Sequence, residues 1–244
     1  MRGMRPLPRI NGHRGQSQTH PENTLPALRE AVRLGADGLE FDVQPTKDGS
    51  IVLMHDRSPV RTTNVAEVLR SKVGLSVQRF TLTELAALDA GSWKDPAFVG
   101  TPVPTLRDVV HAMQGVDVHL TVELKAAPVD PGRYVRRVLD DLGGRGRVTI
   151  MSFDRALAAA ALPLHPSVGL VSSRAPGRED LERFDEFHVN AKRIDRGVVE
   201  RVHQAGGTIT AWTVDDPRQF DRLHDLGVDA ITTNDVMTGR TALV

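Results

Sequence analysis

The chain of 244 residues contains no cysteine. Structural disulfides and zinc sites built from cysteine thiolates are therefore excluded. The chain also lacks net formal charge, because 31 basic side chains balance 31 acidic ones. That balance gives no support for binding to nucleic acid or to a charged membrane surface. Since the absence of cysteine suits a reducing compartment, we expect a cytoplasmic protein.

Long hydrophobic segments are missing as well. No apolar run approaches the roughly 18 residues that a membrane-spanning helix requires. The longest run of small apolar residues, Ala156 to Leu164, favours a helix packed on a sheet. The first residues, MRGMRPLPRINGHRG, have neither the apolar segment nor the cleavage site of a secretory signal peptide. We therefore expect no stable membrane insertion.

What the chain does have is a regular alternation of strand-like and helix-like segments, with 40% hydrophobic residues to build a core. Intervals such as Pro131 to Leu142 and Asp216 to Leu226 are long enough for crossover helices. Repeated βα units with parallel strands predict an α/β protein with a TIM (β/α)₈ barrel, as one domain over residues 1–244. The eight candidate strands are Arg9 to Gly12, Gly38 to Val43, His119 to Leu124, Val148 to Ser152, Val168 to Ser172, Glu186 to Ala191, Thr208 to Val214 and Ala230 to Thr233.

A ninth apolar run, Ile51 to Met54, follows the second strand after only Thr46-Lys47-Asp48-Gly49. A parallel crossover needs a dozen or more residues, so this run should return antiparallel as a hairpin and bring His55 to the barrel rim. Residues 57–104 have weaker periodicity, with short helices expected at 65–70 and 83–88. We interpret them as a small insertion that caps the barrel.

Helix-to-strand turns are also recognisable. Thr24 is a candidate N-cap for a helix to about Leu34, with Gly35 as its C-terminal cap. The segment 34–39, LGADGL, is similar to the segment 226–231, LGVDAI. Both patterns are typical of a helix that ends at glycine and leads into a strand, although such turns share this pattern in general.

Polar residues alternate along two of the predicted strands. Glu40 and Asp42 share one face of a strand, and Glu123 and Lys125 share one face of another. If these faces point into the barrel, Glu40, Asp42 and Glu123 are buried carboxylates that need a cation. Oxygen ligands favour Mg²⁺ or Ca²⁺ over zinc. The alternative is a set of solvated charges at strand ends.

Two histidines follow predicted strands, His13 in His13-Arg14-Gly15 and His55 in His55-Asp56. Histidine titrates near neutral pH and can act as acid or base, as phosphodiester cleavage requires. A lone histidine is more often structural, and we expect the other seven, including His20, His111 and His203, to lie at the surface or in packing.

Four further residues are candidates for binding substrate. Arg14 and Lys125 can neutralise a phosphate or pair with the neighbouring carboxylates. Asn23, within Pro21-Glu22-Asn23-Thr24, is expected to hydrogen-bond near the two histidines, whereas Glu22 is interpreted as part of a helix start. Trp212 is either an apolar wall of the substrate site or a core residue, and Phe153 has the same two interpretations.

The ordered set of these motifs, together with LDAGSW at 88–93 and Pro104-Thr105-Leu106, resembles the glycerophosphodiester phosphodiesterase family from His13 to the end of the chain. The resemblance implies metal-dependent hydrolysis of glycerophosphodiesters to glycerol 3-phosphate and an alcohol in a TIM barrel. It implies that Glu40, Asp42 and Glu123 hold the metal, that His13 is the general base and that His55 is the general acid. Either the glycerol 2-hydroxyl attacks first and water then opens a cyclic phosphate, or water attacks directly, and the sequence leaves both open.

Two positions depart from the family pattern. The last strand ends TTNDV at 232–236 without the proline that often follows, so the last helix must be very short. The tryptophan segment ends at Asp215, where asparagine is common. These departures concern the final turn. Head group, metal identity and oligomeric state are left open by the sequence.

Three other functions compete with this interpretation. A lysophospholipase D-like enzyme on the same scaffold would be favoured by an exposed apolar lip on the insertion, and Phe80, Leu82 and Phe98 are the residues that would form it. A non-catalytic binding barrel would be indicated by a missing histidine or carboxylate. A barrel enzyme acting on sugar phosphates has no reason to carry both histidines and all three carboxylates in this order.

Overall fold

The computed structural model describes residues 6–243, so both ends of the predicted 1–244 domain, and residues 1–5 of the segment considered as a leader, lie outside it. The strands are β1 (Arg9–His13), β2 (Gly38–Pro45), β3 (Ile51–Leu53), β4 (His119–Leu124), β5 (Val148–Ser152), β6 (Val168–Ser172), β7 (Glu186–Asn190), β8 (Thr208–Trp212) and β9 (Ala230–Thr233). The α-helices are α1 (Leu25–Arg33), α2 (Val65–Val68), α3 (Leu82–Ala86), α4 (Leu106–Ala112), α5 (Pro131–Leu142), α6 (Arg155–Ala161), α7 (Arg178–Leu181), α8 (Arg196–Gln204), α9 (Pro217–Leu226) and α10 (Val236–Ala242). Short 3₁₀ turns lie at Arg70–Lys72, Val77–Arg79, Pro96–Phe98 and Ala191–Arg193.

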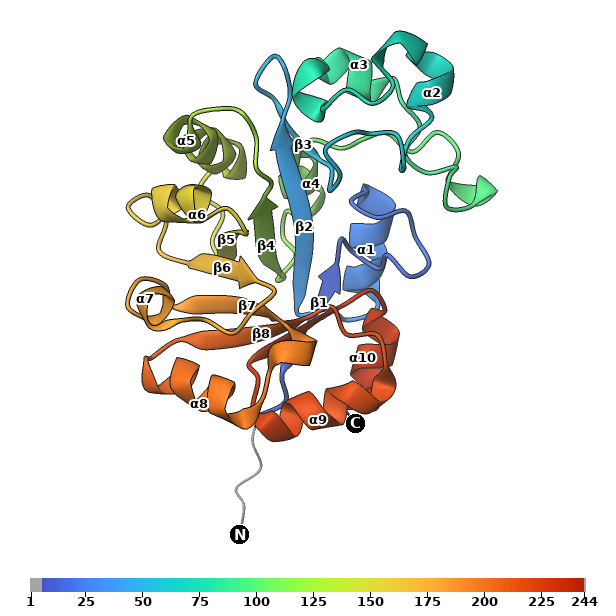
Figure 1. Cartoon of the computed structure of the whole chain (residues 1–244). Helices are drawn as coiled ribbons and strands as arrows, with labels where there is room; N and C mark the ends of the chain where they lie inside the picture. Colours follow the sequence, from blue (N-terminus) through green and yellow to red (C-terminus); the bar gives the residue numbers. More distant parts are fainter. Residues whose placement is uncertain (1–5, 244) are drawn as a thin grey trace.

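The parallel strands close into a barrel surrounded by helices (Figure 1). Neighbouring strands follow the order β1, β9, β8, β7, β6, β5, β4, β2, and β2 pairs back with β1 through His13 and Glu40. The predicted (β/α)₈ barrel is confirmed. The pairing of β1 with β2 also places the first histidine directly beside the first carboxylate.

The hairpin predicted from loop length is confirmed. β3 is antiparallel to the C-terminal end of β2, with Val43 opposite Leu53 and Pro45 opposite Ile51. Gly49 has φ +81° and closes the turn by donating its N–H to Thr46 O at 3.1 Å. Glycine adopts this left-handed conformation without steric strain. Because β3 runs back toward the barrel, the chain delivers His55 to the rim.

The main core lies between the strands and the outer helices. Phe41 and Val43 of β2 are fully buried in this core, together with Leu28 of α1 and Leu106 of α4. Residues that alternate with them along the strands point the other way, into the barrel. The inward face of β2 is therefore the polar one, as its sequence predicts.

Residues 57–104 pack beside the β2–β3 hairpin, to one side of the barrel (Figure 1). They form a second apolar cluster that includes Phe80 and Leu85. Val52 of β3 and Met54, directly after β3, belong to the same cluster. Phe80 O accepts a hydrogen bond from Lys47 N at 2.7 Å. The expected short helices are present as α2 and α3.

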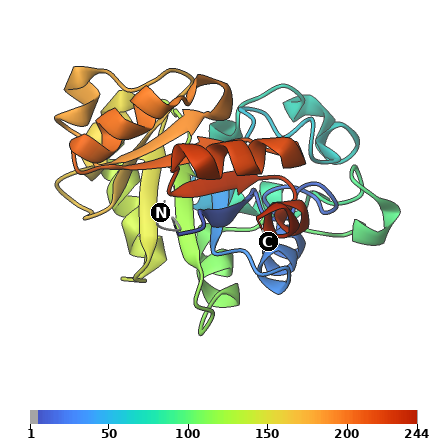
Figure 2. The ribbon, with the colours of Figure 1, turned by 90° about the horizontal axis from the view of Figure 1, so that it is seen from below.

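The first and last elements of the barrel are neighbours. In Figures 1 and 2, the C-terminal helix α10 lies beside the N-terminal helix α1, and it also contacts β1 and α9. Arg240 of α10 donates from Nε to Gly35 O at 2.7 Å, just past the end of α1. Thr24 is the N-cap residue of α1, but its hydroxyl donates to Pro21 O instead of capping the helix. Within residues 6–243, no helix is both long and apolar enough to cross a membrane.

Candidate active site

Polar side chains from four strand ends meet at the carboxyl-terminal mouth of the barrel, where parallel β/α barrels generally build their sites. A pocket of about 110 Å³ lies there. Its lining comprises His13, Arg14, Glu40, His55, Glu123, Lys125, Met151, Phe153, Val171, His188, Trp212, Thr213 and Thr232. Both predicted histidines, both predicted cations and two of the three predicted metal ligands therefore border one cavity.

The loop after β1 is held in an unusual conformation. Gly15 has φ +85°, and a Cβ on it would lie 2.5 Å from the carbonyl carbon of Ala27 in α1. Arg14 and Asn23 also have positive φ, of 55° and 56°. Left-handed conformations are strained for residues other than glycine and tend to occur at functional sites. The strain lets Arg14 N donate to Glu40 Oε2 at 3.1 Å and lets its side chain turn toward the carboxylates.

The three predicted carboxylates come together. Glu40, Asp42 and Glu123 are 2%, 1% and 6% exposed, and one oxygen from each lies within 4.8 Å of the others. Lys125 Nζ lies between two of them, 2.8 Å from Asp42 Oδ1 and hydrogen-bonded to Glu123 Oε1. Arg14 Nε lies 3.1 Å from Asp42 Oδ2 but is not aligned for a hydrogen bond.

The cluster is short of positive charge. Burial, followed by the charge of Asp42, raises the pKa of Glu123 to about 7 and also raises the pKa of Glu40 well above its usual range. Burial opposes ionisation of Asp42 too, but Lys125 and Arg14 hold its pKa below its usual range. A divalent cation would stabilise all three carboxylates in their ionised form. The three carboxylates offer only oxygen ligands, and Lys125 and Arg14 do not balance all of their negative charge. Both features fit Mg²⁺ or Ca²⁺.

His13 lies between the carboxylates and the last barrel strand. Its Nε2 is 3.9 Å from Glu40 Oε2, and its Nδ1 is 2.7 Å from Asn234 Oδ1, directly after β9. Burial, assisted by the neighbouring Arg14 charge, lowers the pKa of His13 to about 4. The ring is therefore neutral near pH 7, which is the form that accepts a proton.

His55 has a different partner, the carboxylate of Asp56. His55 Nδ1 lies 2.7 Å from Asp56 Oδ1, and Arg61 donates to both oxygens of Asp56. Hydrogen bonds from Arg61, with a smaller contribution from His55, lower the pKa of Asp56 to about 2 despite its partial burial. Because an ionised carboxylate only accepts, the Nδ1 of His55 must carry a proton.

Arg61 also connects the two halves of the site. Its guanidinium donates to both oxygens of Glu22 at 2.8 Å, and Glu22 in turn accepts from Arg14 Nη1 at 2.7 Å. A continuous series of ion pairs therefore runs from Asp56 through Arg61 and Glu22 to Arg14. Sequence interpretation assigned Glu22 to a helix start and did not single out Arg61, because nothing local indicates that an insertion residue reaches the loop after β1.

The two remaining candidates lie in the site region, with different contacts. Asn23 hydrogen-bonds neither histidine: its amide donates to Asp42 Oδ2 at 2.8 Å and accepts from Asp42 N at 3.0 Å. Its role is to orient the central carboxylate. Trp212 packs edge-on against Phe153 with ring centroids 5.5 Å apart, and its buried Nε1 has no partner among the described residues.

Three polar residues around the site were not singled out by sequence reasoning. Asn234 and Asp215 form the hydrogen-bonded support of His13, and the only sequence signal was the departure of their two segments from the family pattern. His188 was grouped with surface or packing histidines. It is 2% exposed, yet it lines the pocket and pairs through Nε2 with Glu186 Oε1 at 3.0 Å.

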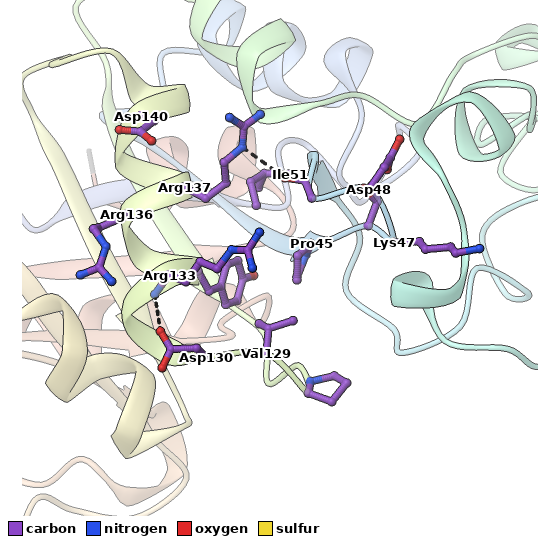
Figure 3. A pocket seen from close by; sticks show the side chains of 14 residues that line it. Pro45, Lys47, Asp48, Ile51, Val129, Asp130, Arg133, Arg136, Arg137 and Asp140 are labelled. Atoms are coloured by element: carbon purple, nitrogen blue, oxygen red, sulfur yellow. Dashed lines mark hydrogen bonds between the residues drawn. The ribbon is translucent and has the colours of Figure 1, made fainter.

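A larger groove of about 900 Å³ lies elsewhere, between the β2–β3 hairpin and α5 (Figure 3). Charges of both signs line it, including Lys47, Asp48, Arg133 and Asp140, and these side chains are exposed. The groove contains no histidine and none of the buried carboxylates. We therefore place the chemistry in the smaller pocket.

The fold and the site together define a β/α-barrel hydrolase with an acidic, histidine-flanked centre. A model of the glycerophosphoryl diester phosphodiesterase family matches residues 13–238. The chain is 33% identical over 241 residues to a glycerophosphodiester phosphodiesterase of Caldanaerobacter subterraneus, covering 94% of this chain and 95% of the relative. The chain therefore belongs to the glycerophosphoryl diester phosphodiesterase family, and it is an enzyme of that class.

Solved structures agree with this assignment. An Oleispira antarctica phosphodiesterase in complex with the product sn-glycerol-3-phosphate is similar with a TM-score of 0.87 at 28% identity, covering 97% of this chain and 96% of that one. A glycerophosphodiester phosphodiesterase of Agrobacterium tumefaciens is similar with a TM-score of 0.80 at 25% identity, covering 98% and 100%. The non-catalytic interpretation of the barrel is thereby set aside.

Proposed function

We propose that this enzyme hydrolyses small glycerophosphodiesters to sn-glycerol 3-phosphate and an alcohol, using a divalent metal ion and the pair His13 and His55. The observation that carries the proposal is the convergence of Glu40, Asp42 and Glu123 within 4.8 Å, at a pocket that both histidines line. The product bound to the similar Oleispira antarctica enzyme supports the same chemistry.

Glu40, Asp42 and Glu123 would hold Mg²⁺ or Ca²⁺. When bound, such an ion stabilises negative charge on the phosphoryl oxygens. Asn23 keeps Asp42 in position by two hydrogen bonds. Lys125 and Arg14 already lie against these carboxylates, and both carry donors suited to a phosphate. The unaligned Nε–H of Arg14 is the donor most readily turned toward a substrate oxygen.

The two histidines have opposite tasks. His13 takes the proton of the attacking hydroxyl, from the glycerol 2-hydroxyl or from water, as a new P–O bond forms. Direct attack by water gives glycerol 3-phosphate at once, whereas attack by the 2-hydroxyl gives a cyclic phosphate that water must then open. His55 gives a proton to the leaving alcohol oxygen as the old P–O bond breaks. A neutral His13 suits the base, and the Asp56 carboxylate orients the His55 ring by accepting a hydrogen bond from its Nδ1. Phe153 and Trp212 would provide an apolar wall for the glycerol carbons.

The lysophospholipase D-like alternative required an exposed apolar lip formed by Phe80, Leu82 and Phe98, and these residues do not favour it. Phe80 is fully buried in the second apolar cluster, and Leu82 packs partly buried against the same cluster. Phe98 contacts the ring of His20, with centroids 4.9 Å apart. The apolar lip that these residues were expected to form is therefore not presented to a lipid chain. We further propose that residues 57–104 belong to the barrel domain, because their cluster shares Val52 and Met54 with the hairpin.

The test is release of glycerol 3-phosphate from a panel of glycerophosphodiesters with choline, ethanolamine, glycerol or inositol head groups, with lysophosphatidylcholine in parallel. The enzyme is assayed after EDTA treatment and again with Mg²⁺ or Ca²⁺ restored. We expect metal-restored release from the small diesters. Activity on the lysolipid alone would transfer the assignment to the lysophospholipase D-like alternative.

His13→Ala is the control for the site. It should abolish release without unfolding the protein, because His13 is the last residue of β1 and its side chain lines the pocket. Release that persists in this variant would remove His13 from the mechanism. A substrate analogue without the 2-hydroxyl separates the two nucleophiles, since only direct attack by water would still cleave it.

A further inference from the structure

Behind His13, on the side away from the carboxylates, lies a short series of hydrogen bonds that the mechanism has not yet used. Asp215, three residues past Trp212 of β8, accepts from Asn234 Nδ2 at 2.6 Å and from Asn234 N at 2.8 Å. Thr233 Oγ1 also lies 3.1 Å from Asp215 Oδ1. The far end of the Asn234 side chain, its Oδ1, meets His13 Nδ1 at 2.7 Å.

The direction of these bonds is fixed by Asp215. An ionised carboxylate can only accept hydrogen bonds, so the amide nitrogen of Asn234 must face Asp215. The amide oxygen must then face the histidine. Ser17 Oγ supports the same orientation by donating to this oxygen at 2.8 Å. Rotating the amide by 180° would set its oxygen against the carboxylate and its NH₂ against Ser17 and His13.

An amide oxygen is also purely an acceptor, so His13 must carry a proton on the Nδ1 that faces it. When the ring holds a single proton, its Nε2 therefore has a free lone pair on the side of Glu40 Oε2, which lies 3.9 Å away. We propose that Asp215 and Asn234 act together as positioning residues that select the Nδ1–H tautomer of His13. The inference rests on the proposed function for its catalytic consequence, because a base must present an unprotonated nitrogen to the substrate.

The pair is drawn from two different loops, after β8 and after β9, and neither residue lines the pocket. Asp215 therefore reaches the pocket through Asn234, and Asn234 reaches it through His13. A merely structural role would keep the two loops together but would not determine which ring nitrogen of His13 is protonated. The tautomer is thus the readout that separates the two roles.

The experiment is ¹⁵N NMR of the histidine rings in the full-length enzyme with saturating Mg²⁺, with His13 identified by the signals lost in His13→Gln. In the wild type we expect a protonated Nδ1 and an unprotonated Nε2. Asn234→Leu, which leaves no acceptor, should shift the ring toward the Nε2–H form. Its kcat should fall about 10- to 100-fold, as for other outer partners that orient a reactive imidazole, with a smaller change in KM.

Asp215→Asn tests the orientation of the amide, since two neighbouring amides can pair in either sense. It should yield a mixture of tautomers and a loss of about fivefold in kcat, the effect of roughly one hydrogen bond. The double variant Asp215→Asn with Asn234→Asp places a carboxylate on His13 and should restore the Nδ1–H form and most of the lost kcat. Asp216→Asn, at the partly buried neighbour that pairs with the exposed Arg218, is the matched control.

A wild-type His13 with its proton on Nε2 would overturn the inference, and so would an unchanged tautomer in both Asn234→Leu and Asp215→Asn. Because NMR needs no turnover, this result stands apart from the proposed function. A wild-type enzyme that releases no glycerol 3-phosphate would refute the proposed function, while the tautomer measurement would still decide the role of Asp215 and Asn234.

Discussion

Arg61 provides the sharpest test of how the two halves of the site are connected. It is the one residue of the 57–104 insertion found in contact with both Glu22 and Asp56, through hydrogen bonds of 2.7 to 3.1 Å. Replacing Arg61 with Gln removes the charge and the fork that bridges two carboxylates. Asp56 and Glu22 then lose the arginine that fixes their positions. The hydrogen bond of Asp56 to His55 and that of Glu22 to Arg14 are therefore less rigidly placed.

The expected losses differ in size for stability and for turnover. The Arg61 side chain is 45% exposed, so each of its two ion pairs contributes only about 0.2–1 kcal/mol to folding. A total near 1 kcal/mol lowers the melting temperature by about 2–4 °C in a chain of this size. Turnover should fall further, by about tenfold in kcat, because Asp56 and Glu22, which orient His55 and Arg14, lose the arginine that they share.

The assay is steady-state hydrolysis of glycerophosphocholine, or of the best diester in the panel, alongside thermal melting. Arg57→Gln is the matched control, because Arg57 is exposed and its side chain has no ion pair among the described residues. Arg61→Lys should recover little, since an ammonium cannot bridge two carboxylates as the guanidinium fork does. Combining Arg61→Gln with Asp56→Asn should cost less than the sum of the two single effects, as expected for residues in one network.

Two results would refute this reasoning. One is a kcat for Arg61→Gln within twofold of that for Arg57→Gln, with only the melting temperature lowered. The other is strict additivity of Arg61→Gln and Asp56→Asn. Either would mean that Arg61 is an ordinary surface ion pair with no influence on the site.

Three further predictions concern separate parts of the molecule. His55→Ala should lower kcat by about 10²–10⁴, as for a lost general acid, and near-wild-type hydrolysis would remove His55 from the mechanism. Glu123→Gln should show a smaller rise in melting temperature with saturating Mg²⁺ or Ca²⁺ than wild type or the exposed control Glu200→Gln, and an equal rise would mean that Glu123 is not a ligand. Burial lowers the pKa of His119 from 6.5 to about 4, so the unfolded chain binds more protons between these values, and stability present above pH 6.5 falls as pH drops toward 4. His119→Gln should flatten this decline by about 2 kcal/mol after allowance for solvent screening, as measured by urea unfolding at pH 7 and pH 4.5. An unchanged slope would contradict it.

Much of the fold follows from local sequence. Alternation and loop length predict the strands, and a turn too short for a crossover predicts the antiparallel β3. The similarity of LGADGL and LGVDAI extends to hydrogen bonds: Asp37 exchanges two bonds with Ile10, and Asp229 exchanges the same two with Ile209. Both glycines, Gly35 and Gly227, have positive φ. The glycine turn is encoded within six residues, whereas the hydrogen bonds join it to the preceding strand, 27 and 20 positions away.

The inward-facing carboxylates are predictable for the same reason. The two-residue period of a strand fixes Glu40 and Asp42 on one face, whatever the rest of the chain does. In a closed parallel barrel that face points inward, and Glu123 of the neighbouring strand is directly opposite Asp42 in the register. Histidines at strand ends then arrive at the same rim.

The partners of these residues are a different matter, because they come from loops far apart in sequence. Asn234 lies 221 positions from His13, and Arg61 lies 39 positions from Glu22. No periodicity or spacing indicates such pairs, since loop conformation depends on packing and not on a repeating backbone pattern. The sequence by itself therefore determined the barrel, together with the three carboxylates and the two histidines, His13 and His55, at its mouth. Only the tertiary structure decided which neighbours orient them, which nitrogen of His13 is held by a neutral amide and which of His55 by a carboxylate.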